Sequence, residues 1–147
     1  MHTRQTIREF FINQIKTGVT LVNGRVEASR VFPIEKGKTP AIIVYTKEET
    51  SEAATIGTMG SSIRELILSI EIYAKGVTQL DDMIDSIAAQ IEETFGVSCK
   101  PIPEITGIDY ESFTTEYNGE GDQPFLVGTI EYSVMYWINN DDPQNEG

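Results

Sequence analysis

The chain of 147 residues is 39% hydrophobic and 23% charged, with one cysteine, one histidine and a formal net charge of −12. These numbers indicate one folded domain and exclude wholesale disorder, an internal disulfide and a Cys/His zinc site. The acidity argues against nucleic acid and anionic membranes as partners, and no apolar run approaches the ~20 residues that cross a bilayer. The first residues lack the apolar stretch of a signal peptide, so we expect a soluble intracellular protein.

Residues 3 to about 17 are predicted to form a helix, because their apolar side chains recur with a period near 3.6 residues. The apolar stripe consists of Ile7, Phe10, Phe11 and Ile15. Thr3 is the expected N-cap, and Gly18 the expected C-terminal stop.

Two strands are predicted next, followed by a polar segment. Val26–Phe32 forms a short strand that Pro33 ends, and the continuous apolar run Ala41–Tyr45 is typical of a strand buried on both faces. Residues 46–60 are rich in Thr, Ser, Glu, Ala and Gly. They are interpreted as a long mobile loop or as an extended hairpin tip.

Residues 63–75 give the strongest strand pattern in the chain, with one fully apolar face made of Leu66, Leu68, Ile70, Ile72 and Ala74. A second helix is predicted over Gln79–Phe95, with an apolar stripe made of Leu80, Met83, Ile84, Ile87, Ile91 and Phe95. Thr78 and Asp81 resemble a capping box, and Gly96 ends the helix.

Two final strands are predicted at about residues 107–117 and 124–138, with Gly128 as a bulge in the second. Residues 139–147 contain no apolar side chain and are predicted to be a disordered acidic tail. The order of elements indicates a single α+β domain over residues 1–138. In it, two helices pack on one face of a largely antiparallel mixed β-sheet.

Clusters that could perform chemistry all have a simpler explanation. Asp81, Asp82 and Asp85 suggest a metal or acid–base site, but carboxylates in the first turn of a helix stabilise its dipole. Residues 120–122 lack the alternating ligands of a calcium loop, and the glycines near Ser61 lack the lysine of a phosphate loop. We therefore predict no catalytic residue, no metal and no cofactor.

The uneven distribution of charge favours a role in assembly. Residues 1–50 contain eight basic and five acidic residues, a net of +3, whereas residues 51–147 contain three basic and 18 acidic residues, a net of −15. Such asymmetry suits a subunit that packs a less acidic surface against acidic neighbours. The interface residues expected from the first helix and from the segment after residue 46 are Arg4, Arg8, Glu48, Glu49, Glu52, Thr58 and Ser61.

Four stretches give the sequence a family likeness. They are Met1–Arg8; Asn23-Gly24-Arg25 before Val31-Phe32 and Thr39–Tyr45; Leu66–Ala74 before Leu80-Asp81-Asp82-Met83; and Gly107–Tyr110 before Thr129–Tyr136. In this order they resemble the phage tail terminator family, the minor tail protein U group of long-tailed phages with non-contractile tails. The resemblance covers nearly the whole chain.

The resemblance implies an α+β subunit of a hexameric ring in the virion tail, assembled in the host cytoplasm. Such a ring caps the completed tail tube, stops polymerisation of the major tail protein and presents the surface that joins the head-tail connector protein. A neck or head-completion protein and a small-molecule or peptide-binding α+β module are the alternative interpretations.

Overall fold

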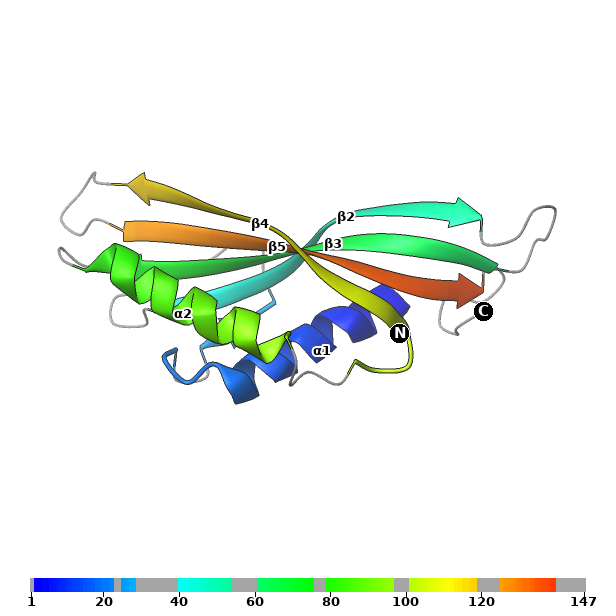
Figure 1. Cartoon of the computed structure of the whole chain (residues 1–147), viewed down its shortest axis with the longest axis horizontal. Coiled ribbons are helices and arrows are strands. Elements are labelled where there is room, and N and C mark those ends of the chain that lie inside the picture. Colours follow the sequence, from blue (N-terminus) through cyan, green and yellow to red (C-terminus); the bar gives the residue numbers. More distant parts are fainter. Residues whose placement is uncertain are drawn as a thin grey trace.

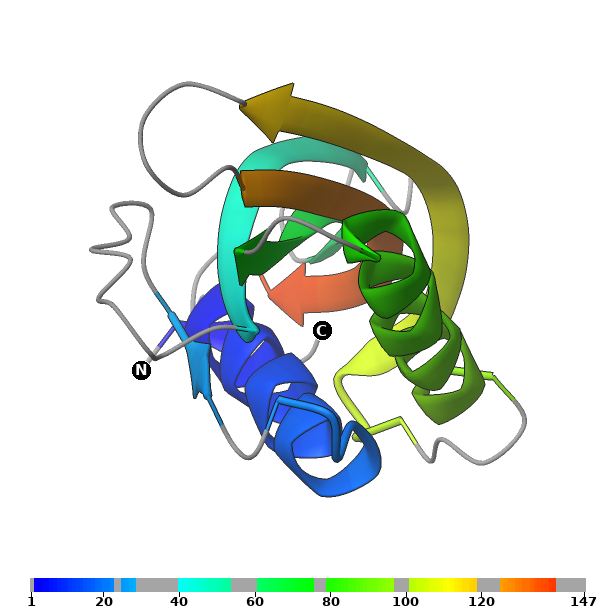
Figure 2. The ribbon, with the colours of Figure 1, turned by 90° about the vertical axis from the view of Figure 1, so that its left-hand side faces the viewer.

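The computed structural model describes residues 2–22, 25–28, 40–53, 61–75, 79–96, 101–118 and 125–139. Its elements are α1 (Thr3–Gly18), β1 (Val26–Glu27), β2 (Ala41–Ala53), β3 (Ser61–Lys75), α2 (Leu80–Thr94), β4 (Ile105–Asn118) and β5 (Phe125–Asn139). Both helices lie on one side of a strongly twisted sheet (Figure 1; Figure 2). The predicted α+β class and the placement of the helices are therefore confirmed.

The five strands are ordered β1-β2-β3-β5-β4, so the two longest neighbours, β3 and β5, form the centre of the sheet. β1 runs parallel to β2, and the other pairs are antiparallel. β3 and β5 stay in register over their full length, from the pair Ser61 and Asn139 to the pair Lys75 and Phe125. The predicted sheet, mixed but largely antiparallel, is thus the one observed.

The core forms where the apolar face of the sheet meets the two helices. The alternating residues of β3 that were predicted to share an apolar face are all fully buried: Leu66, Leu68, Ile70, Ile72 and Ala74. Phe11 of α1 stacks on Phe95, with ring centroids 4.4 Å apart, and both rings contact Tyr132 of β5. The predicted helix stripes are buried as well, apart from Met83, which is exposed because it lies beside that contact surface.

Of the two interpretations of residues 46–60, the mobile loop is wrong and the extended hairpin is confirmed for the part that is described, because β2 continues to Ala53 and pairs with β3. Backbone pairing with β3, such as Thr50 with Glu65, holds these polar residues in a strand, and a register shift between Thr46 and Glu48 marks a bulge. Pairing with the following strand, β3, outweighs the loop-like composition here. Residues 54–60, with Thr58, lie outside the described residues.

Other predictions fall wholly or partly outside the described residues. Of the predicted strand at residues 26–32, β1 covers Val26 and Glu27. The flanking residues Arg25 and Ala28 are not in a strand, and residues 29–39 are not described. Cys99, the turn at residues 119–124 and residues 140–147 are also not described. The disordered acidic tail therefore stays a prediction.

The N-terminal ends of both helices differ from the predicted caps. The N-cap of α1 is His2, whose Nδ1 accepts a hydrogen bond from the backbone N–H of Arg4 at 3.0 Å, while Thr3 is the first helical residue and is buried. Gly18 is the last residue of the helix, so the predicted C-terminal stop at this glycine is confirmed. The N-cap of α2 is Gln79, in the left-handed conformation with φ of 59° and no side-chain cap. Thr78 lies outside the described residues.

The predicted bulge at Gly128 is also wrong, since this residue pairs in register with Ile72 and with Thr115. The glycine is required because α2 approaches the sheet closely at this point. A Cβ atom added to Gly128 would lie 2.5 Å from Cγ2 of Ile84 and 3.1 Å from the ring of Phe113. The bulges of β4 lie elsewhere, between residues 105 and 107 and between residues 110 and 112.

Substituting Gly128→Ala should lower the free energy of unfolding by about 1–3 kcal/mol, because the added methyl group overpacks the contact with Ile84. Urea denaturation measures the change. Gly107→Ala is the matched control, since a Cβ atom there meets no atom within 4 Å. Equal stability of the two variants would show that α2 can shift away from the sheet without cost.

Candidate assembly surfaces

The N-terminal end of α1 is held to the sheet by an ion pair with the carboxylate of Glu49 on β2. Oε2 of Glu49 accepts from the guanidinium of Arg4 at 2.8 Å and from that of Arg64 on β3 at 3.4 Å. Its Oε1 accepts from the hydroxyl of Tyr136 on β5. These four side chains, here called the Glu49 cluster, join α1 to three neighbouring strands.

The centre of the Glu49 cluster is largely screened from water, since the side chains of Glu49 and Arg64 are 16% and 19% exposed, whereas Arg4 at its rim is 41% exposed. Burial raises the pKa of Tyr136, and the hydrogen bond to Glu49 adds to the rise, so the phenol stays protonated and donates. Burial, and then the positive charge of Arg4, lower the pKa of His2. A neutral His2 is what the helix cap needs, because only an unprotonated Nδ1 can accept a hydrogen bond.

Sequence reasoning missed two members of this cluster, Arg64 and Tyr136. A signal for Arg64 was available, because it lies in phase with Leu66 and Leu68 on the apolar face of its strand. A charged side chain in the phase of a buried face predicts a charged partner on the element that covers it. The identity of that partner, Glu49, follows only from the pairing of β2 with β3.

The structure brings together two of the predicted interface residues, Arg4 and Glu49, within one subunit. Arg8, one turn further along α1, makes no hydrogen bond or ion pair with any described residue, and Glu48 is exposed on β2. Glu52 and Ser61 lie near the ends of β2 and β3 that face the undescribed connection. The use of these residues between subunits stays a prediction.

The side of the sheet away from the helices (Figure 2) is here called the open face. It is rich in carboxylates. Its side chains alternate with those of the core, so β3 contributes Glu65 and Glu71 to it. Glu65 accepts a hydrogen bond from Ser133 at 3.0 Å, and Glu131 pairs with Lys47 at 2.5 Å. A surface of this charge favours basic groups on whatever contacts it.

The two edges of the sheet resist the addition of further strands. β4 forms one edge, and on the other side the described part of the chain covers β2 at Ile42 and Ile43, which pair with β1. β2 contains a bulge beyond the part that β1 covers, and β4 contains two bulges and carries exposed Asp109, Glu111 and Glu116. Bulges and charged side chains are the features that prevent edge-to-edge pairing between sheets.

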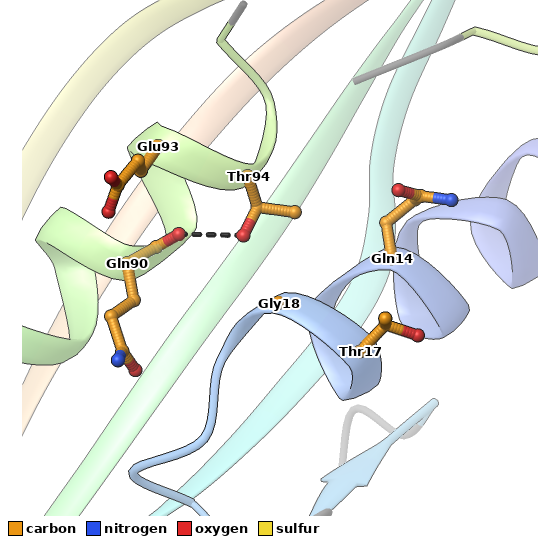
Figure 3. Close-up of a pocket in the computed structure, with 6 residues that line it drawn as sticks. All are labelled: Gln14, Thr17, Gly18, Gln90, Glu93 and Thr94. Carbon is orange, nitrogen blue, oxygen red and sulfur yellow. Dashed lines mark hydrogen bonds between the residues drawn. The ribbon is translucent and has the colours of Figure 1, made fainter. Parts of the chain in front are cut away.

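A crevice between the C-terminal ends of α1 and α2 is lined by polar side chains (Figure 3). Thr94 donates a hydrogen bond to the carbonyl oxygen of Gln90 at 2.7 Å, and Gly18 lies so close that an added Cβ would be 2.2 Å from the Thr94 hydroxyl. The other lining residues are Gln14, Thr17 and Glu93. One carboxylate among amides and hydroxyls makes no nucleophile–base pair, so we interpret the crevice as a feature of helix packing.

Within the described part of the chain, no three His, Cys, Asp or Glu side chains are grouped so that they could hold a metal ion. Asp81 and Asp82 occupy the first turn of α2, where their charges favour the helix dipole. Neither of the two helices described is long and apolar enough to span a membrane.

Comparison with known proteins finds similarity in fold but not in sequence. No protein-family model matches the chain, and no curated protein sequence matches it. Among solved structures, a chain from the virion of a native gene transfer agent (GTA) particle is similar in fold, with a TM-score of 0.52 and 13% sequence identity. The match covers 88% of this chain and 94% of that chain, so the likeness extends over nearly the whole of both.

Proposed function

We propose that this chain is a structural subunit of a phage-like virion and that it acts as a tail terminator. The proposal rests on the fold likeness to a virion chain of the GTA particle, which extends over almost all of both chains. A fold alone does not determine a function. The more specific role comes from the sequence, because its four stretches named above, taken in chain order, resemble the tail terminator family.

The blocked sheet edges support this role. A terminator must bind the last ring of a polymerising tube and then give the next tube subunit nothing to pair with. Bulges and carboxylates on β4 and the bulge in β2 leave neither edge suited to strand addition. Further growth of the tube would therefore stop at this subunit by geometry, without a catalytic group.

In the proposed assembly, six copies form a closed ring between the major tail protein and the head-tail connector protein. A ring formed by rotation requires each subunit to present two different surfaces to its neighbours. The acidic open face and the face that carries α1 are two such surfaces, since they lie on opposite sides of the sheet (Figure 1).

Tube assembly in vitro tests the proposal. Purified major tail protein polymerised with this chain should give tubes that stop growing and bear a ring at one end in negative-stain images. Tubes grown without it should become overlong. If tube lengths are the same in both samples, the terminator role is wrong. If the chain leaves tube length unchanged but is required to close the head, the head-completion alternative is correct.

A further inference from the structure

The open face contains a depression with aromatic walls and acidic groups, here called the tyrosine pocket. Its walls include the rings of Tyr45, Tyr73 and Phe125, from β2, β3 and β5. Two carboxylates, Glu71 and Glu116, also line it. The pocket thus collects three rings and two negative charges from all four long strands of the sheet.

The polar groups of the pocket leave negative charge available. The hydroxyl of Tyr73 donates to Oε2 of Glu71 at 3.0 Å, which orients that carboxylate. Glu116 is exposed and makes no hydrogen bond or ion pair with any described residue. Of the two described lysines on this face, Lys47 is paired with Glu131, and Lys75 lies at the end of the sheet, opposite Phe125 in register.

This combination suits a guanidinium group better than other ligands. Aromatic faces attract cations, and the planar, weakly hydrated guanidinium stacks on rings more readily than an ammonium group does. Carboxylates beside the rings accept its N–H groups in charge-assisted hydrogen bonds. A neutral or anionic ligand would leave Glu71 and Glu116 without a counter-charge.

The chain itself contains an arginine with no described partner. Arg4 and Arg64 are bonded to Glu49, and Nε of Arg25 donates to the carbonyl oxygen of Pro40. Arg8 is the one described arginine that makes no such contact. It lies on α1, on the opposite side of the sheet from the tyrosine pocket, so it cannot enter the pocket of its own subunit (Figure 1).

We propose that the tyrosine pocket binds the guanidinium of Arg8 from a second copy of this chain. The contact joins two different surfaces, so it is heterologous and repeats from subunit to subunit, as a closed ring requires. The inference rests on the proposed ring-forming function and specifies which surfaces meet.

Charge reversal on each side of the contact tests the inference by sedimentation velocity of the full chain over a range of concentrations. Arg8→Glu and Glu116→Arg should each weaken self-association by about tenfold or more. The double variant Arg8→Glu/Glu116→Arg should recover a substantial part of it. Lys16→Glu and Asp85→Arg, which make the same charge changes at exposed sites on the two helices, should associate like the wild type.

Circular dichroism confirms that each variant is folded, and Glu71→Gln repeats the test without reversing a charge. If Arg8→Glu associates as the wild type does, or if the double variant recovers nothing, the inference is wrong. Should wild-type chain still cap tail tubes in that case, the proposed function stands without it. A strictly monomeric wild type that leaves tubes uncapped would overturn both.

Discussion

Replacing Glu49 with alanine should lower the free energy of unfolding by about 3 kcal/mol, the low end of the range for breaking a buried ion pair. Two guanidinium groups and the hydroxyl of Tyr136 would lose the carboxylate that they share. The residual exposure of Glu49 and Arg64 places the expected loss at the low end, because water can partly replace the lost contacts. The first turn of α1 would also lose its ion pair to the sheet.

Chemical denaturation of Glu49→Ala and of Glu48→Ala measures this effect against a matched control. Glu48 is the adjacent residue on the same strand and is exposed, so its removal should change stability by no more than about 0.5 kcal/mol. Arg4→Ala should cost less than Glu49→Ala, because the Arg4 side chain is 41% exposed and two partners of Glu49, Arg64 and Tyr136, remain. Similar losses for Glu48→Ala and Glu49→Ala would contradict a structural role for the Glu49 cluster.

Alkaline solution should destabilise the fold from about pH 10 upward, the usual pKa of tyrosine. Burial raises the pKa of Tyr136 in the folded state, and its hydrogen bond to Glu49 raises it further. Burial, and then the negative charge of Glu71, likewise raise the pKa of Tyr73 on the open face. Both phenols then stay protonated in the folded chain at a pH where the unfolded chain releases its protons.

The sign follows from the protons bound in each state. Below pH 10 both states keep the phenol protons, and the stabilisation is fully present. Above pH 10 the unfolded state binds fewer protons, so stability is lost until the pKa of the folded state is reached. For the fully buried Tyr136, the loss is about 1.4 kcal/mol per pH unit within this window.

Urea denaturation at pH 9, 10 and 11 checks this prediction, with Tyr136→Phe expected to reduce the dependence on pH. Tyr117→Phe, at a ring that is 62% exposed, should keep the wild-type dependence. If Tyr136→Phe loses stability above pH 10 as steeply as the wild type does, the phenol of Tyr136 ionises as easily in the folded chain as in the unfolded one.

The sequence alone determined the two helices, the strand β3 and the side of each that is buried. The stripe from Ile7 to Ile15 and the alternation from Leu66 to Ala74 are local patterns, and burial follows them residue by residue. Periodicity suffices here because the geometry of a helix or strand fixes which neighbouring side chains share a face. The α+β class then follows from the order of the elements.

The tertiary structure alone decided the features that depend on partners in other strands and helices. The extension of β2 to Ala53 needs β3 beside it, and the contact of Arg4 with Glu49 joins residues 45 positions apart. Gly128 is a glycine because of Ile84, a residue on a different element. Local composition carries no signal for such contacts, since they arise only when the strands pair and the helices pack on them.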